Sequence, residues 1–344
     1  MVPMISLVLY RSSITNEKLS LTTLSGWGWN SQHNVGMLET TSGLLNSLRT
    51  LYTRTVYGVE DTLDAIFDGI SQGNVLIALE DLGSSISSIN NITTESVDIV
   101  FLTYSLMSNT QVVESVTTEV SNSTVFMCAV PYYPDSNVRD IPNLVLYWAD
   151  LYQATYLSGV VAGSVLEPGG KLCYIKPFND TECNVAMNSF AQGVMKANPT
   201  AIIHYWISNT YYDVYSLTQL AQHLLNDHDC DQLGFYGAVL EALFVFTAAG
   251  KYVSAATADV RMALGDGVLS SALYDWTPVY SRIVRAKLNN AVDILAPDRV
   301  VTYGIDAGAT YLSDISASVP IEKLELLHEV WHNLQIVLRE MSIN

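Results

Sequence analysis

The chain has 344 residues, of which 49% are hydrophobic and only 15% are charged, and its formal net charge is −18. The apolar content excludes intrinsic disorder, and 16 Lys and Arg against 34 Asp and Glu exclude nucleic acid and anionic membrane surfaces as partners. Because chains average about 25% charged residues, the low charge indicates a neutral-polar surface, typical of secreted proteins or of surfaces covered by other protein.

The first part of the chain alternates short apolar segments with amphipathic ones, which is typical of parallel βα units. Residues 1–10 form an apolar segment that is short and has no basic n-region. We therefore expect a strand at 5–10 rather than a signal peptide. The sequence contains no run of about 18 apolar residues, so no membrane span is predicted. Further strands are expected at 55–59, 97–102, 125–130 and 144–148, and helices at 37–51, 62–89 and 111–120.

The same alternation continues after residue 148. A helix is predicted with Ala154, Leu157, Val161 and Val165 on one face, and residues 168–170, Pro-Gly-Gly, then break the chain. Strands are expected at 171–175, 201–207, 232–236 and 267–273, and helices at 183–198, 215–225 and 275–288. A last helix is predicted with Pro320 in its first turn, and its apolar stripe is formed by Ile321, Leu324, Leu327, Trp331, Leu334 and Leu338.

Two similar βα series that join near residues 150–170 predict an α/β fold with two doubly wound lobes. Parallel sheets that are covered on both faces need near-continuous apolar strands. This architecture accounts for much of the missing charge.

The glycosylation sequons and the cysteines are informative about the cellular compartment of the protein. The N-x-[ST] acceptors Asn91, Asn122 and Asn179, together with the low Lys content, favour an extracellular or cell-surface glycoprotein. The cysteines are Cys128, Cys173, Cys183 and Cys230, and they allow three pairings if all are oxidised. Cys173 and Cys183 are close enough in sequence to close a short loop, and buried free thiols are the alternative.

Two groups of residues have the composition of metal sites. Residues 328–332, His-Glu-Val-Trp-His, match H-E-x-x-H, which places two imidazoles on one helical face. Its apolar neighbours, and the absence of a well-spaced third ligand downstream, favour a helix that packs on a sheet over a zinc protease. The group His223, Asp227, His228, Asp229, Cys230 and Asp231 could bind a transition metal, but a helix end followed by a polar loop is the expected alternative.

No nucleophile elbow, Walker loop or dinucleotide-binding glycine motif is present, and we expect neither an enzyme nor a cofactor or resident metal. Trp27 lies in the aromatic segment Gly-Trp-Gly-Trp, and its ring either stacks on a sugar or base or packs beneath a loop. Tyr211 and Tyr212 follow the predicted strand at 201–207 and could line a cleft or an interface.

Three segments carry a family resemblance. They are 156–163 (Tyr-Leu-Ser-Gly-Val-Val-Ala-Gly), 170–175 (Gly-Lys-Leu-Cys-Tyr-Ile) and 188–199 (Asn-Ser-Phe-Ala-Gln-Gly-Val-Met-Lys-Ala-Asn-Pro). They resemble the basic membrane protein (BMP) or PnrA-like family of substrate-binding lipoproteins, whose patterns are Y-L-A-G-x-x-A-G, G-K-v-G-f-v and F-x-x-G-x-x-x-x-N-P. Trp206 with Asp213 resembles the family's Trp-containing strand end. The resemblance is clear over about 150–290 and co-linear elsewhere.

This resemblance implies the type I periplasmic-binding fold, with two Rossmann-like lobes joined by crossover strands and a nucleoside held in the cleft between them. It implies that residues 1–150 and about 275–319 form lobe 1 and that 151–274 form lobe 2. Residues 320–344 would then be a C-terminal helix packed on the lobes.

Several of the family's ligand contacts are replaced in lobe 1. The family has an aspartate after the first strand and then a D-K-S-F-N segment, where this chain has Arg11 and, at 16–21, Asn-Glu-Lys-Leu-Ser-Leu. The family's acidic residues after the fourth strand correspond to 130–133, Val-Pro-Tyr-Tyr. Because a buried ribose needs its hydroxyls paired, at about 1–3 kcal/mol for each lost partner, we expect an altered or lost ligand.

In lobe 2, the resemblance implies that Tyr274 stands where the family has a ligand-binding Lys, and that Asp259 is the retained member of the family's pair of acidic residues. Tyr211 or Tyr212 would take the place of a second aromatic ring that stacks on the ligand. The expected function is a non-enzymatic extracellular binding protein for a nucleoside- or sugar-like molecule. The alternative is a structural subunit that assembles with copies of itself and has lost its ligand. The candidate ligand-binding residues of the interlobe cleft are Trp27, Trp206, Tyr211, Tyr212, Asp259 and Tyr274.

Overall fold

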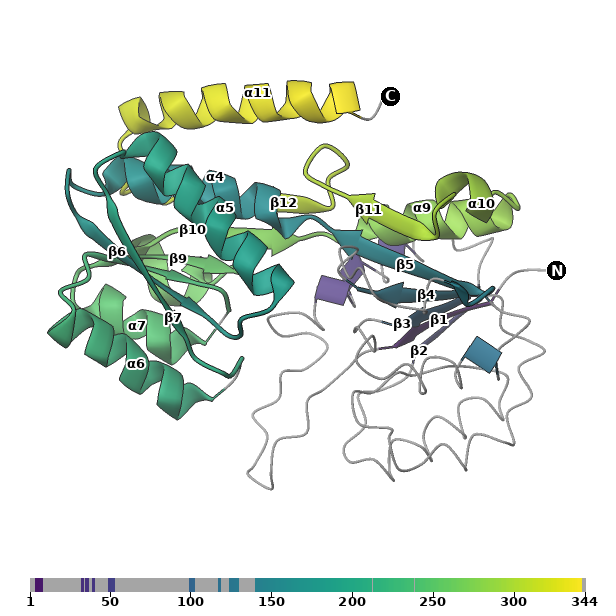
Figure 1. Ribbon diagram of the computed structural model, residues 1–344, viewed down its shortest axis with the longest axis horizontal. Helices are drawn as coiled ribbons and strands as arrows, with labels where there is room; N and C mark the ends of the chain where they lie inside the picture. Colours follow the sequence, from purple (N-terminus) through teal and green to yellow (C-terminus); the bar gives the residue numbers. More distant parts are fainter. Residues whose placement is uncertain are drawn as a thin grey trace. The chain divides into compact units, whose positions relative to one another are not determined.

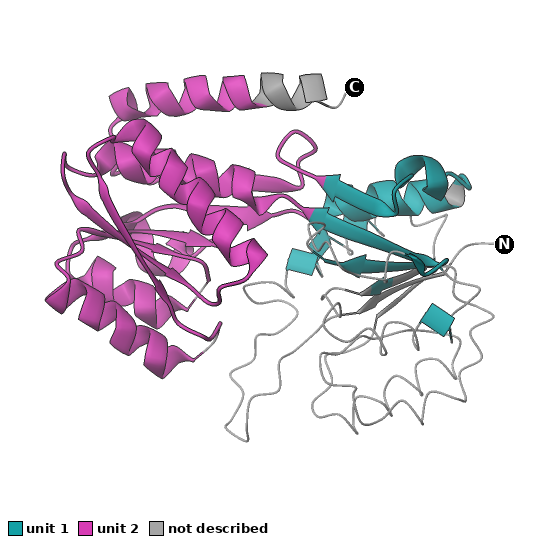
Figure 2. Cartoon of the chain, viewed as in Figure 1, with its two compact units in different colours: residues 1–26, 30–148, 276–302 teal, residues 27–29, 149–275, 303–344 magenta. Residues whose placement is uncertain are grey.

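The structure is a computed structural model that describes residues 4–8, 32–33, 35–36, 39–40, 49–52, 99–102, 117–118, 124–129, 140–211, 213–237 and 239–341. The chain divides into two compact units (Figure 2): unit 1 comprises residues 1–26, 30–148 and 276–302, and unit 2 comprises 27–29, 149–275 and 303–344. Residues 303–319, which the resemblance assigned to lobe 1, are counted in unit 2, because the strand at 310–312 pairs with the unit 2 sheet.

Unit 1 is built on a parallel sheet. Its strands are β1 (Met4–Val8), β2 (Arg49–Tyr52), β3 (Ile99–Leu102), β4 (Thr124–Cys128), β5 (Leu144–Ala149) and β11 (Val300–Tyr303), and its helices include α9 (Thr277–Leu288) and α10 (Val292–Leu295). The order across the sheet is β11-β5-β4-β3-β1-β2 (Figure 1), and the neighbours from β5 to β2 pair in parallel. The strands expected at 5–10, 97–102, 125–130 and 144–148 are therefore confirmed over the residues of each that the structure describes.

The prediction of a helix at 37–51 is wrong at its C-terminal end. Residues 39–40 are helical, but Arg49–Tyr52 forms strand β2, with Thr50 in register with Ile5 of β1. Pairing beside β1 overrides the helical pattern there, because tertiary context outweighs local propensity. The strand expected at 55–59 and the helix expected at 62–89 lie outside the described residues.

Buried aromatic side chains pack α9 against the unit 1 sheet. Phe101 of β3 meets Tyr280 of α9 edge to face, with ring centroids 4.7 Å apart. Tyr147 of β5 meets Trp276, the residue before α9, at 5.7 Å. These four rings are fully buried, and each such pair adds about 0.5–1.5 kcal/mol beyond the burial of its area.

Unit 2 contains a second sheet with helices on both faces. Its strands are β6 (Lys171–Lys176), β7 (Ile202–Ile207), β8 (Gln232–Phe235), β9 (Tyr252–Ala256), β10 (Val268–Tyr274) and β12 (Thr310–Leu312). They lie in the order β12-β10-β9-β8-β6-β7, with β12 antiparallel to β10 and the other pairs parallel. The helices are α4 (Leu151–Val165), α5 (Thr181–Ala197), α6 (Val214–Asp227), α7 (Leu240–Ala248), α8 (Arg261–Leu264) and α11 (Leu324–Met341).

Alternation along β6 explains how the helices divide between the two faces of this sheet. Cys173 and Ile175 belong to the core that includes Leu217 of α6 and Phe246 of α7. Tyr174, which points the other way in a pleated strand, contacts Phe190 of α5 with ring centroids 5.1 Å apart. Figure 1 shows α6 and α7 on one side of the sheet and α4 and α5 on the other. The strands and helices expected between residues 148 and 288 are confirmed, each within a few residues of its predicted bounds.

Glycines allow α4 and α5 to cross at close range. A Cβ added to Gly159 of α4 would lie 2.1 Å from the carbonyl oxygen of Phe190, and one added to Gly193 of α5 would lie 2.1 Å from that of Tyr156. Real Cβ atoms do not come this close to a backbone oxygen. The glycines of the segments 156–163 and 188–199 therefore have a packing role.

The last helix packs through its apolar face. Val330 of α11 joins a buried cluster with Leu157 and Val160 of α4, and Trp331 and Leu334 pack against it. Ile321, the first residue of the predicted stripe, is 82% exposed, because it belongs to a short 3-10 turn that precedes α11. Among the described residues, no helix is both long and apolar enough to cross a membrane.

Candidate functional site

The parallel strands of unit 2 end at one edge of their sheet, which is where ligands bind in open α/β folds. β6 leads into the first turn of α5, β8 is followed directly by Tyr236, and β10 ends at Tyr274. Three segments that are distant in sequence thus bring polar side chains to one place. These side chains belong to Glu182, Tyr236 and Tyr274.

Glu182 lies at the centre of this group. The hydroxyl of Tyr236 donates a hydrogen bond to Oε1 of Glu182, and the hydroxyl of Tyr274 donates to the same oxygen over 3.4 Å. Both tyrosines are buried, whereas Glu182 is half-buried. Within the part of the chain that the structure describes, no hydrogen bond reaches Oε2 of Glu182, which leaves this oxygen available to a bound molecule.

The environment of Glu182 shifts its titration. Burial raises the pKa of Glu182 from 4.5 to about 7, the Asp180 carboxylate adds to the rise, and the hydrogen bonds from Tyr236 and Tyr274 oppose it. The side chain therefore changes charge near neutral pH. Carboxylates with a pKa perturbed by burial and neighbouring charge concentrate at functional sites. In its ionised form Glu182 can accept hydrogen bonds from hydroxyl groups of a ligand.

A thiol and a phenol extend the group. Asp180 is the N-cap of α5, where its Oδ1 accepts a hydrogen bond from the amide of Cys183 over 2.8 Å. The Sγ atom of Cys183 lies 3.8 Å from the hydroxyl oxygen of Tyr211, and Phe178 meets the Tyr211 ring edge-on at 5.2 Å. Burial raises the pKa of the Cys183 thiol. Since the thiolate is the reactive form of cysteine, Cys183 is unsuited to nucleophilic chemistry.

Lys176, at the carboxyl end of β6, is 1% exposed. Its Nζ donates to the side-chain oxygen of Asn179 over 3.1 Å and to that of Asn184, and it lies 4.9 Å from the centre of the Tyr205 ring. Among the described residues this lysine forms no ion pair, so neutral dipoles and an aromatic face hold its side chain. Lys176 thereby braces the loop that carries Asp180 and leads to Glu182.

The structure places the predicted ligand-binding residues in different surroundings. Tyr211 and Tyr274 belong to the Glu182 group. Asp259 follows β9 and so lies at the same edge of the sheet, where its Oδ1 accepts a hydrogen bond from the Arg261 amide over 3.1 Å. Trp206 lies apart from the group, because it packs against the core beneath α6 and α7, with its ring 4.9 Å from that of His228. The predicted residues Trp27 and Tyr212 lie outside the described residues.

Sequence reasoning missed Glu182, Tyr236 and Lys176. Glu182 stands in the first turn of a helix, where a glutamate is ordinary because it suits the helix dipole. Tyr236 was included in a predicted strand. Their positions in the sequence could have identified them, because all three residues lie at or beyond the carboxyl ends of predicted strands, where α/β folds carry their binding sites.

Cys173 and Cys230 form a disulfide with Cα atoms 5.8 Å apart, so the structure selects neither the short Cys173–Cys183 loop nor wholly reduced cysteines. Cys128 and Cys183 are buried thiols. The pairing follows from the sheet, because Cys230 precedes β8, which lies beside β6.

Of the remaining sequence motifs, the group at 223–231 is divided: His223 contacts Asp227 and His228, whereas Cys230 and Asp231 have other partners. Cys230 is in the disulfide, and Asp231 accepts hydrogen bonds from the Lys171 amide and from Nζ of Lys251. His328 and His332 are both exposed on α11. Among the described residues, no group of three or more His, Cys, Asp or Glu side chains could hold a metal ion. Of the glycosylation acceptors, Asn179 is exposed, and Asn91 and Asn122 lie outside the described residues.

Comparison with known sequences gives one family and two partial relatives. A family model described as "ABC transporter substrate-binding protein PnrA-like" matches residues 22–343. TsgA13 of Haloferax volcanii, named as an ABC transporter glucose-binding protein, is 27% identical over 154 residues, which are 43% of this chain and 39% of that protein. Metabotropic glutamate receptor-like protein K of Dictyostelium discoideum is 26% identical over 151 residues, 43% of this chain and 21% of the relative. The matches thus span well under half of either relative.

Solved structures agree on the fold. A solute-binding protein of an ABC transporter from Aeropyrum pernix superposes with a TM-score of 0.65 at 11% identity, covering 97% of this chain and 91% of that one. One from Conexibacter woesei gives 0.63 at 15% identity, covering 96% of both chains. One from Burkholderia graminis, in complex with D-arabinose, gives 0.52 at 12% identity, covering 92% and 96%. Identities this low show the fold alone, which is the expected type I periplasmic-binding fold.

Proposed function

Because the chain belongs to the PnrA-like family of ABC transporter substrate-binding proteins, we propose that it binds a small neutral solute of the sugar or nucleoside class. The solute lies against the carboxyl ends of the unit 2 strands, where Glu182 accepts hydrogen bonds from its hydroxyl groups. The observation that carries this proposal is the convergence of Tyr236 and Tyr274 on one oxygen of a half-buried carboxylate.

The chemistry of the group favours a polyhydroxylated ligand. A carboxylate with a free oxygen accepts hydrogen bonds from hydroxyl groups, and a bond of this charge-assisted kind contributes about 1.5–3 kcal/mol. A net charge of −18 disfavours an anionic solute. The glucose-binding name of the Haloferax relative and the D-arabinose in the Burkholderia structure support the same class.

The contacts of this chain differ from the usual ones of its family, and we propose that the ligand differs accordingly. Arg11 and the segments 16–21 and 130–133 replace polar or acidic family residues. In unit 2, a tyrosine at 274 replaces a family lysine. Tyr274 donates a neutral hydrogen bond to Glu182, where a lysine would neutralise the carboxylate. The substitution thus leaves Glu182 free to act as an acceptor for ligand hydroxyls.

We also propose that the protein works outside the cytoplasm and has no catalytic role. Its disulfide suits an oxidising compartment, and its family consists of binding proteins. The exposed Asn179 is a candidate for glycosylation, which would place a glycan beside the N-terminus of α5.

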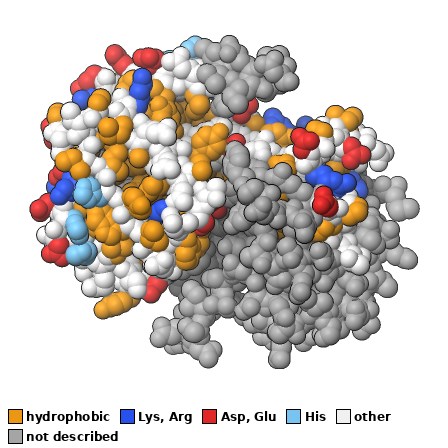
Figure 3. All heavy atoms as spheres, in the orientation of Figure 1, with side chains coloured by type: hydrophobic (Ala, Val, Ile, Leu, Met, Phe, Trp, Pro, Cys, Tyr) orange, Lys and Arg blue, Asp and Glu red, His pale blue; other side chains and the backbone are white. Residues whose placement is uncertain are grey.

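A second candidate function is self-assembly, and one observation favours it. β7 is an edge strand, and Ile202, Tyr205 and Ile207 are 46%, 53% and 37% exposed. Exposed apolar edge strands are templates for pairing with another chain. Figure 3 shows further hydrophobic side chains on the described surface in this view. A filament or oligomer built through β7 would explain the low surface charge without requiring a ligand.

A thermal-shift screen of the full chain with neutral sugars and nucleosides tests the first function, and the mass of the same sample in solution tests the second. A ligand at 100 times its Kd adds about 2.7 kcal/mol to the free energy of unfolding. A shift with a monomeric mass supports solute binding. No shift from any compound, together with large oligomers that Tyr205→Lys dissociates, would overturn solute binding in favour of assembly.

A further inference from the structure

Two histidines meet at the end of α6, away from the Glu182 group. The Nε2 atoms of His223, one turn before the end of α6, and His228, just after it, lie 3.1 Å apart. Nδ1 of His223 lies 2.6 Å from Oδ2 of Asp227. His223 and Asp227 are exposed, with side chains 51% and 66% accessible. His228 is half-buried, so neither ring is closed off from solvent ions.

The hydrogen bond to Asp227 fixes the state of His223. A carboxylate accepts, so the proton of neutral His223 is on Nδ1 and its Nε2 presents a lone pair toward His228. Two lone pairs repel at 3.1 Å. In the absence of metal, the His228 Nε2–H group therefore donates a hydrogen bond to Nε2 of His223, and a metal ion that displaces this proton would meet a lone pair from each ring.

We propose that His223 and His228 bind one divalent transition-metal ion through their Nε2 atoms, with water in the remaining coordination positions. Metal–nitrogen bonds of about 2.0–2.1 Å place two ligand nitrogens roughly 2.9 Å apart at a right angle and roughly 3.3 Å apart at the tetrahedral angle. The observed 3.1 Å lies between these values. Asp227 occupies the place of the carboxylate that commonly orients a metal-bound histidine, and imidazole pairs suit Zn²⁺, Ni²⁺ and Cu²⁺.

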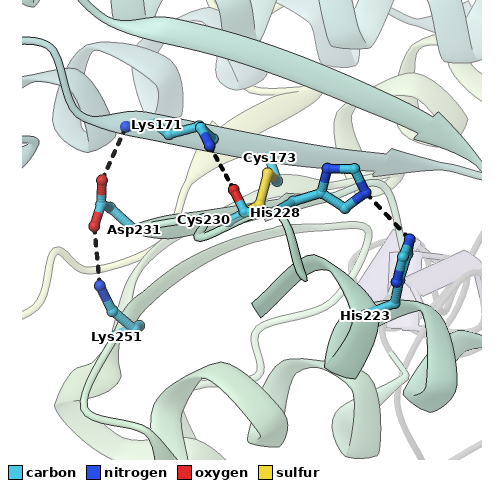
Figure 4. Close-up of a disulfide and its surroundings, with 7 residues drawn as sticks. All are labelled: Lys171, Cys173, His223, His228, Cys230, Asp231 and Lys251. Atoms are coloured by element: carbon cyan, nitrogen blue, oxygen red, sulfur yellow. Dashed lines mark hydrogen bonds and ion pairs between the residues drawn. A yellow bond between two sulfur atoms is a disulfide. The ribbon is translucent and has the colours of Figure 1, made fainter. Parts of the chain in front are cut away.

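The loop that carries His228 is held in place before any ion binds. Nζ of Lys171 donates to the carbonyl oxygen of His228 over 2.6 Å. Cys230, two residues later, is cross-linked to Cys173 of β6. Asp231 receives hydrogen bonds from the Lys171 amide and from Nζ of Lys251, each 2.9 Å long. Figure 4 shows the His228 ring extending from this anchored segment toward His223, so the two ligands are preorganised.

The other histidine pair provides a matched control. His328 and His332 are four residues apart on α11 and exposed, so they share the helical spacing of a metal-binding pair. Between the two rings the structure records neither a contact nor a neighbouring carboxylate bonded to a ring nitrogen, within the described residues. The close approach and the bracing aspartate therefore distinguish His223 and His228 from an ordinary surface pair.

Calorimetric titration of the tag-free full chain with NiCl2 tests this site. We expect one ion per chain, and a loss of affinity of at least about tenfold in His223→Asn and in His228→Asn. Asp227→Asn should weaken binding by about tenfold, the lower end of the usual effect of removing such a partner. His328→Asn/His332→Asn should remain within about twofold of the wild type.

A second measurement does not depend on variants at the ligands. Ni²⁺ bound here should quench the fluorescence of Trp206, whose ring lies 4.9 Å from that of His228, and the quenching should disappear in Trp206→Phe. The proposal is overturned if no Ni²⁺ binds at 1:1 stoichiometry, if binding is unchanged in His223→Asn and His228→Asn, or if only the α11 double variant loses it.

Discussion

The crossing of α4 and α5 allows a quantitative prediction for Gly159→Ala. The new Cβ would lie 2.1 Å from the carbonyl oxygen of Phe190 and 2.9 Å from its carbonyl carbon. Both are backbone atoms, so no side-chain rotation can relieve the overlap. The two helices must separate by about 1 Å along their contact, and this loosens the packing of the interior.

The expected cost follows from two opposing effects. Overpacking a close contact costs about 1–3 kcal/mol, and a clash with backbone belongs at the upper end of that range. Replacing Gly by Ala inside a helix gains about 1 kcal/mol. The net destabilisation is about 2 kcal/mol, which corresponds to about 4–8 °C in the Tm of a unit of this size.

Urea and thermal unfolding followed by circular dichroism measure this loss. Ser189→Ala on α5 is the matched control. Within the described part of the chain, the Ser189 hydroxyl bonds only the carbonyl of Val185 in the same helix, so the free energy of unfolding should change by less than about 0.5 kcal/mol. Gly193→Ala clashes with Tyr156 at the same crossing, so the double variant should cost less than the sum of the two. A stability of Gly159→Ala equal to or above that of the wild type would refute the close crossing.

Three further predictions concern stability. Removing the disulfide with Cys173→Ala/Cys230→Ala should lower the free energy of unfolding by about 4 kcal/mol, given the 57-residue separation; dithiothreitol should destabilise the wild type but not this variant, and equal effects on both would contradict the assignment. Burial and the nearby Asp306 raise the pKa of Asp150 from 3.8 to about 7, and Oδ1 of Asp150 is buried without a hydrogen-bond partner among the described residues. Between pH 3.8 and 7 the folded state keeps a proton that the unfolded chain releases, so the stability contributed by Asp150 falls as pH rises through that window. Asp150→Asn should therefore raise the Tm at pH 8 more than at pH 5. An equal change in Tm at both pH values would argue against the raised pKa. By the same sign, Glu182→Gln should raise the Tm at pH 8 and leave it nearly unchanged at pH 4.5, because the pKa of Glu182 rises from 4.5 to about 7 on folding; a lower Tm at pH 8 would show that the ionised carboxylate stabilises the fold.

The architecture of unit 2 could be predicted from the sequence, because the local sequence pattern there agrees with the tertiary packing. Gly159, Gly163 and Gly193 occur in segments that match the family, and the structure shows why the glycines are needed, since a Cβ at each would overlap backbone of the facing helix. The family match over residues 22–343 confirms that resemblance. The helical pattern of 37–51 failed because β2 pairs beside β1, and such long-range pairing leaves no local signature.

The candidate site was less predictable, for a physical reason. Trp206 and Tyr211 stood out by residue type, but type does not say which face of a strand a side chain occupies, and Trp206 packs against the core. Glu182 looks like an ordinary first-turn residue of a helix. Its importance depends on Tyr236 and Tyr274, which are 54 and 92 residues away and reach it only because β6, β8 and β10 end at one edge. The cysteine pairing was undetermined for the same reason.

The affinity of Glu182→Gln for the solute found in the screen, measured by calorimetry at pH 8, tests the central claim most directly. Glu241→Gln is its matched control, because Glu241 also stands in the first turn of a helix but is exposed. The account predicts binding about ten- to a hundredfold weaker in Glu182→Gln, the loss of one charge-assisted hydrogen bond, and unchanged binding in Glu241→Gln. Wild-type affinity in Glu182→Gln would contradict the claim that Glu182 holds the solute.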